Sequence, residues 1–171
     1  MVTYYRKRVL LLMSIVGFSS ALLAETRQMT SMDKIAEQHS LPCQSLLTDL
    51  AADVLKSNPH RMLEHSQAID ENSLFSSFTV TDYRDRSSHV TFHGVRNQNG
   101  QCQASVVESF ALQTDCSDAR HEAFSKWTFQ GKLNQETFVL SDRRQQDRQA
   151  FLTEQGAHLC LVSVRYSITS P

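Results

Sequence analysis

The sequence predicts an α+β fold: an N-terminal helical segment packed on a mostly antiparallel sheet of five or six strands and tied by two disulfides. Three observations support this prediction. Apolar residues recur at helical spacing between residues 42 and 55. From Phe75 onward apolar and polar residues alternate, which is typical of half-buried strands. The chain also carries an even number of cysteines, four.

Residues 1–24 have the three parts of a secretory signal peptide. Basic residues at 6–8 precede an apolar run at 9–18, and cleavage is expected after Ala21, which has the small Ser19 two residues before it, or after Ala24, which has the bulkier Leu22 there. The run is shorter than the roughly 20 apolar residues that a membrane-spanning helix needs. We therefore expect a periplasmic or secreted protein with no integral membrane span in its mature form.

The rest of the chain, residues 25–171, has the length of a single domain. We expect a helical segment at 25–72 and a strand-rich part at 73–171. The chain has 17 Lys and Arg against 18 Asp and Glu. Because three of the basic residues lie in the leader, its removal changes the net charge from −1 to −4. Such a chain has no basic excess for nucleic acid, so nucleic acid is not an expected partner.

The N-terminal part contains one strong helix signal. A weaker helix is expected at 29–39. Pro42 suits the first turn of a helix because it has no N–H to satisfy. Ser57-Asn58-Pro59 is expected to end this helix. Its apolar stripe consists of Cys43, Leu46, Leu47, Leu50, Ala51, Val54 and Leu55. Residues 60–72 are expected to add another short helix.

Six segments have strand character in the second part of the chain. An Asp115 or Ser117 cap starts a short helix that we expect to run to about Trp127. The turn Asn97-Gln98-Asn99-Gly100 joins two of the strands, because Asn and Gly tolerate the backbone of tight hairpins. The expected strands are 75–82, 89–96, 101–113, 137–140, 150–153 and 158–168.

The cysteines Cys43, Cys102, Cys116 and Cys160 are expected to form two structural disulfides, since none has the spacing of a zinc or redox motif. If strands 101–113 and 158–168 pair antiparallel, the start of one meets the end of the other. That arrangement favours bridges 43–102 and 116–160, and it is the one that we prefer. Parallel pairing would instead favour 102–160 with 43–116.

No group of residues forms a recognisable catalytic, cofactor or metal motif. Ser117, Asp118 and His121 lie close together, but they suit the start of a helix and no nucleophile-elbow motif is present. Glu108 interrupts an apolar strand face, and we expect that the strand leaves the core there or that the carboxylate meets an arginine; a buried catalytic acid is the alternative. The histidine pairs 60/65 and 89/93 do not have metal-ligand spacing.

Apolar residues also occur on the second face of the expected strands: Val107, Ala111, Leu159 and Leu161. Something should cover them. The short helix near Phe124 and Trp127 is the expected cover, and a partner protein is the alternative.

The sequence thus favours a non-enzymatic, protein-binding domain of the cell envelope or a secreted one. An inhibitor or immunity-type protein and an accessory subunit of an envelope assembly fit this description equally. The partner would be another envelope or secreted protein. The competing functions are a small periplasmic hydrolase using Glu108 or His121, and a carrier with an apolar cavity between helix and sheet.

Overall fold

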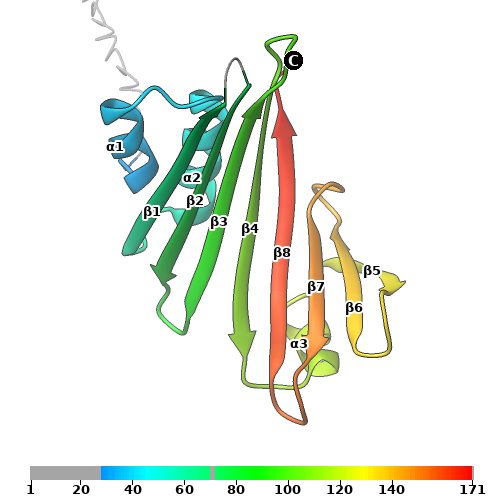
Figure 1. Ribbon diagram of the computed structural model, residues 1–171. Coiled ribbons are helices and arrows are strands. Elements are labelled where there is room, and N and C mark those ends of the chain that lie inside the picture. The colour runs from blue at the N-terminus through cyan, green and yellow to red at the C-terminus, as the bar shows by residue number, and fades with distance from the viewer. Residues whose placement is uncertain (1–27, 70–71, 171) are drawn as a thin grey trace, which may run out of the picture.

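The computed structural model of the chain describes residues 28–69 and 72–170 (Figure 1). Eight strands form one antiparallel sheet in the order β1-β2-β3-β4-β8-β7-β6-β5. In chain order the elements are α1 (Ser31–Gln38), α2 (Gln44–Leu55), β1 (His60–Ile69), β2 (Asn72–Asp82), β3 (Ser87–Arg96), β4 (Cys102–Leu112), α3 (Cys116–Glu122), β5 (Trp127–Lys132), β6 (Thr137–Asp142), β7 (Gln149–Glu154) and β8 (Cys160–Thr169). The long central strands β4 and β8 join two halves of the sheet.

Helices α1 and α2 form where the sequence predicts them. Thr30 caps α1 through a capping box, in which its side chain accepts from the Asp33 N–H and the Asp33 carboxylate accepts from the Thr30 N–H. The apolar stripe of α2 is buried against β3 and β4, through Leu47, Leu50, Ala51 and Leu55. No side chain caps the start of α2, so its stability comes mainly from burial of this apolar stripe against the sheet.

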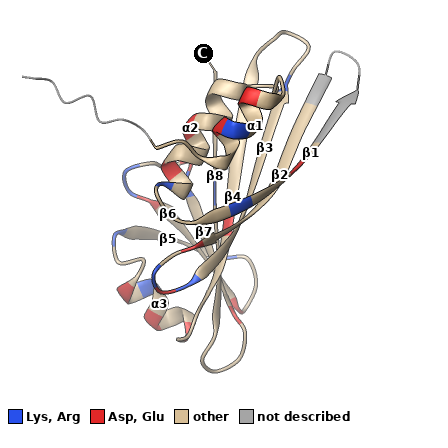
Figure 2. Cartoon of the chain, turned by 90° about the vertical axis from the view of Figure 1, so that its left-hand side faces the viewer, with Lys and Arg blue, Asp and Glu red and all other residues tan. Residues whose placement is uncertain are grey.

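The third helix lies on the same side of the sheet as the first two. Figure 2 shows the sheet nearly edge-on, with all three helices on one side of it. Asp115 caps α3 by accepting a 2.8 Å hydrogen bond from the Asp118 N–H, as expected from the sequence. The helix ends at Glu122, before the position near Trp127 where we expected it to end.

The two halves of the sheet follow the same plan. In each half a helix is followed by a meander of four strands, α2 with β1–β4 and α3 with β5–β8. In each half a disulfide joins the start of that helix to the first residue of the last strand. The turns before these last strands also match: the Asn97 N–H donates to the Gln101 carbonyl and the Gln155 N–H to the Leu159 carbonyl. This repetition is structural, since the amino-acid sequence contains no recognisable internal repeat.

The disulfides are Cys43–Cys102 and Cys116–Cys160, with Cα atoms 5.3 and 4.9 Å apart. This is the pairing that antiparallel strands favour, and β4 and β8 do pair antiparallel. The alternative 102–160 with 43–116 is thereby excluded.

The core consists of two clusters that share one face of the sheet. The first lies under α1 and α2 and includes Phe75, Phe92 and Val106, and the second lies under α3 and includes Leu152 and Val162. Strands β4 and β8 contribute to both clusters.

The predicted strand count is wrong, because the sheet has eight strands rather than five or six. Residues 60–69 form β1 instead of the expected short helix, and residues 127–132 form β5. Both missed strands lie at the edges of the sheet. Few of their described side chains reach the core: Met62 packs against it from β1, and no residue of β5 is fully buried, so the apolar–polar alternation is weak. In β5 a register shift between Phe129 and Gly131 further disrupts the alternation.

The signal peptide predicted for residues 1–24 lies outside the described residues. Within the described part of the chain, no helix has both the length and the apolar character needed to cross a membrane.

Candidate functional site

The face of the sheet opposite the helices has no element packed on it in the described part of the chain. Figure 1 looks onto this face, with the helices behind the sheet. Side chains alternate between the two faces along each strand. The register places Leu63 beside Phe78 and Val107 beside Arg165, all on this side. We call it the open face.

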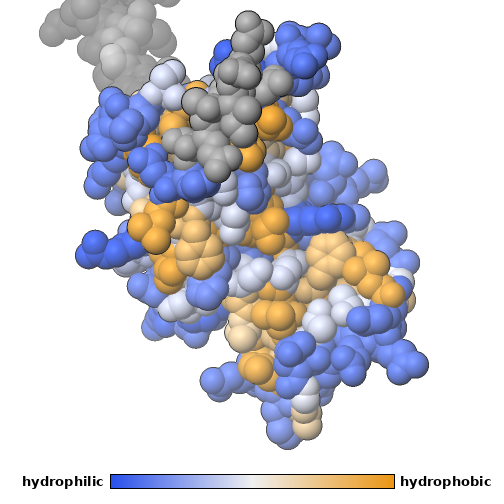
Figure 3. All heavy atoms as spheres, viewed as in Figure 1, coloured by the Kyte–Doolittle hydropathy of each residue, from blue (hydrophilic) through white to orange (hydrophobic). Residues whose placement is uncertain are grey.

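The exposed apolar side chains of the open face lie in groups rather than singly (Figure 3). Leu63 is 75% exposed and Phe78 is 44% exposed. Figure 3 shows the apolar side chains in two groups, one over β1–β3 and one over the lower part of β4 and β6–β8. The exposed members on the open face are Leu63, Leu74, Phe78, Val80, Val95 and Leu161. Apolar patches of this kind mark interaction sites on soluble proteins.

Between the apolar groups the open face is basic. Arg61, His65, His89, His93 and Arg165 are exposed on its strands. On the described strands of this face, Asp82 at the end of β2 is the one carboxylate, and it accepts a 2.7 Å hydrogen bond from the Ser87 hydroxyl. Asp147 of the β6–β7 loop adds a second carboxylate close to Arg165.

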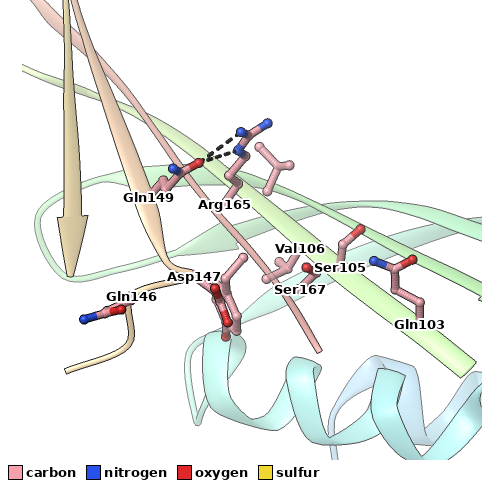
Figure 4. A pocket seen from close by; sticks show the side chains of 10 residues that line it. Gln103, Ser105, Val106, Gln146, Asp147, Gln149, Arg165 and Ser167 are labelled. Carbon is pink, nitrogen blue, oxygen red and sulfur yellow. Dashed lines mark hydrogen bonds between the residues drawn. The ribbon is translucent and has the colours of Figure 1, made fainter. Parts of the chain in front are cut away.

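A hollow of about 490 Å³ lies where β7 begins and β8 continues without it. Ser105, Ser167 and Arg165 line the hollow together with Gln146 and Asp147 of the β6–β7 loop (Figure 4). The side-chain oxygen of Gln149 accepts hydrogen bonds from Arg165 Nε and Nη2 at 3.2 and 3.0 Å. These bonds hold the guanidinium group at the rim of the hollow.

The expectation that the short helix covers the second face is wrong. Helix α3 contacts β7 and β8, and its Ala119 packs in the same cluster as Val162 and Val164 of the core face. The predicted bond between Cys116 and Cys160 could have indicated which face of the sheet α3 covers. Cys160 belongs to the core-facing side of its strand, so a bond from Cys116 to Cys160 draws α3 to that side.

The residues suspected of catalysis do not meet in one place. Ser117, Asp118 and His121 are exposed on α3, where His121 Nε2 lies 3.3 Å from Arg120 Nη2. None of them lines the cavity that contains Glu108. No group of three or more His, Cys, Asp or Glu residues in the described part of the chain is placed to hold a metal ion.

Glu108 lies on the core face, between the two apolar clusters. Its register partner Val164 belongs to the second cluster, while Val106 on the same strand belongs to the first. A recess of about 210 Å³ surrounds the Glu108 side chain and is bounded by the end of α2 and two loops. Its wall includes Arg86 and Arg148, which sequence reasoning missed because both lie in loops. The wall is charged, which does not match the apolar cavity expected of a carrier.

Comparison with known protein families finds no matching family model, and comparisons with curated proteins and with solved structures find no match either.

Proposed function

We propose that this protein is an exported binding domain that holds another envelope or secreted protein on its open face. The observation that supports this most strongly is the uncovered sheet face with its exposed apolar side chains, Leu63 and Phe78 above all. The solvated face of an antiparallel sheet normally carries polar side chains, so large exposed apolar side chains there call for a partner. Here all three helices lie on the other side.

The charge of the open face favours a particular kind of partner. Arginine and histidine side chains surround the apolar groups, and carboxylates are nearly absent from the strands. Opposite charges steer association and fix orientation. The partner should therefore present apolar side chains flanked by carboxylates.

A capture experiment with matched variants tests this proposal. The oxidised protein, bound to a resin, is incubated with an envelope extract, and the captured proteins are identified by mass spectrometry. The test variant is Leu63→Asp/Phe78→Asp. The control is Leu133→Asp, because Leu133 is 70% exposed but lies in the β5–β6 turn, away from the open face. Circular dichroism verifies that all three proteins are folded.

We expect one partner that the wild type and Leu133→Asp capture and that the double variant loses. With the purified partner, the double variant should bind at least about tenfold more weakly, which corresponds to about 1.4 kcal/mol. Added salt should slow association. Equal capture by all three proteins would show that the open face is not the binding surface.

The activity of the captured partner then separates the two roles that fit the sequence. A stoichiometric complex that silences one hydrolase supports an inhibitor or immunity-type protein. Recovery with a multi-protein envelope assembly supports an accessory subunit.

A further inference from the structure

The recess around Glu108 has the features of a small-ligand site, and it lies on the opposite face of the sheet from the open face. Seven polar side chains line it: Asp53, Lys56, Tyr83, Arg86, Glu108, Arg148 and Tyr166. They come from α2 and its C-cap, β4, β8, the β2–β3 turn and the β6–β7 loop. The recess thus lies at the junction of the two halves of the sheet, and the exposed Asp53 and Lys56 form its rim.

Three buried polar atoms in these side chains have no hydrogen-bond partner among the described residues. They are Glu108 Oε1, Arg86 Nε and Arg148 Nε. Arg86 Nη1 donates to the Asp85 carboxylate at 3.2 Å, which leaves its Nε free, and no ion pair in the described part of the chain joins Glu108 to either guanidinium group. Buried charged groups in proteins are nearly always paired or hydrogen-bonded. One acceptor and two donors are therefore left for something that enters the recess.

Aromatic rings hold both guanidinium groups in place. Arg86 Cζ lies 4.3 Å from the ring centre of Phe110 and 4.9 Å from that of Tyr83. Arg148 Cζ lies 5.3 Å from the ring centre of Tyr166. Stacking uses the flat face of a guanidinium group and leaves N–H groups at its edge free to bind an anion. The two donors are thus positioned before any ligand arrives.

The two tyrosines of the recess are held as neutral donors. The Tyr166 hydroxyl donates to Asp53 Oδ2 at 2.8 Å, and the Tyr83 hydroxyl to the Val54 carbonyl at 3.3 Å. Burial raises the pKa of both phenols; the charge of Glu108 and a hydrogen bond to it add to the effect for Tyr83, and the hydrogen bond to Asp53 adds to it for Tyr166. They therefore add no negative charge to the recess.

We propose that the recess binds a small carboxylic acid that carries a hydroxyl or ammonium group close to its carboxylate. The carboxylate would accept from Arg86 and Arg148, since guanidinium groups match its geometry. The hydroxyl or ammonium group would donate to Glu108. The recess of about 210 Å³ is small, which fits an α-hydroxy or α-amino acid of a few carbons.

Three ligands with the same carbon skeleton test this proposal. L-Lactate carries a hydroxyl group, L-alanine carries an ammonium group, and propionate carries neither. Each is titrated into the purified, oxidised protein by calorimetry, with inorganic phosphate as a further ligand. We expect L-lactate or L-alanine to bind at least about tenfold more tightly than propionate, because only they satisfy Glu108.

Three variants assign the binding to the recess. Glu108→Gln should remove most of the preference over propionate, and Arg148→Lys should weaken binding at least about tenfold because Lys lacks the planar fork. Arg165→Gln removes a positive charge on the other face and should leave binding unchanged.

A measurement on the wild type does not depend on how the variants fold. In nuclear magnetic resonance spectra the Nε–H signals of Arg86 and Arg148 should shift on ligand addition, and the Arg165 signal should not. The proposal is overturned if L-lactate and L-alanine bind no better than propionate. It is likewise overturned if phosphate alone binds, or if the ligands leave the Arg86 and Arg148 signals in place.

Discussion

The Tyr166 hydroxyl on β8 donates a 2.8 Å hydrogen bond to Asp53 Oδ2 on α2, which lies 113 residues earlier in the chain. Tyr166 is only 6% exposed, whereas Asp53 is exposed. This bond joins the helix of the first half of the protein to the last strand of the second half. The position of α2 on the sheet therefore depends on both halves.

The substitution Tyr166→Phe tests this connection. We expect the free energy of unfolding to fall by about 1 kcal/mol, because the exposure of Asp53 reduces the value of a hydrogen bond to its charge. Urea denaturation provides the measurement. Tyr83→Phe is the matched control, since its 3.3 Å bond to the Val54 carbonyl is longer and should contribute less. A smaller loss for Tyr166→Phe than for Tyr83→Phe would contradict the prediction.

Stability should decline in alkali because of the same tyrosines. Burial raises the pKa of Tyr83 and Tyr166 above the ordinary 10.0 in the folded protein. The folded state thus favours the neutral phenols, and this contribution is complete below pH 10.0 and is lost as pH rises through the raised values. They are the only tyrosines in residues 25–171, so the phenolate absorbance of that segment reports them alone.

In an alkaline titration the phenolate signal should appear together with loss of the folded circular dichroism spectrum. The unfolded protein in urea should titrate near the ordinary value. Reversible ionisation of both phenols near pH 10.0 with the fold intact would refute the prediction.

Removal of either disulfide should destabilise the protein by a similar amount. The bridges span 59 and 44 residues, and in the chain-entropy model loops of such lengths each contribute about 4 kcal/mol. The variants Cys43→Ala/Cys102→Ala and Cys116→Ala/Cys160→Ala are compared with the wild type by guanidinium denaturation. If one pair proves neutral while the other is essential, the two halves do not depend on their bridges in the same way.

Gly94 is required where β3 passes closest to α2. A Cβ atom at this position would lie 2.8 Å from Leu47 Cδ1 and 3.2 Å from the Pro42 carbonyl oxygen. Gly94→Ala should therefore cost about 1–3 kcal/mol by overpacking. In a double-mutant cycle, Leu47→Ala should relieve part of this cost, so that the double variant loses less stability than the sum of the single variants. Strict additivity would show that Leu47 is not the obstacle.

Sequence reasoning succeeded where a residue pattern reports a single local force. The apolar stripe of α2, the Asp115 cap and the disulfide pairing all follow from short-range geometry, and all are confirmed. It failed for β1 and β5, because few described side chains of these edge strands are buried in the core and their alternation is weak.

The candidate sites depend on relationships that no single segment contains. Val107 and Leu161 gave a correct sign of a second apolar face, but the side chosen by α3 decides whether that face is covered. Glu108 was conspicuous in its strand. The two arginines near it come from loops 62 residues apart in number, Arg86 and Arg148, and only the pairing of β4 with β8 brings those loops together.

The disulfide pattern has a consequence for the order in which this chain matures. The first cysteine in the sequence bonds to the second and the third to the fourth, so the two covalent loops do not overlap. A chain that enters an oxidising compartment N-terminus first presents Cys43 and Cys102 before either cysteine of the second pair. Oxidation of the cysteines in the order of their arrival would yield the native pairing directly, with no reshuffling of bonds.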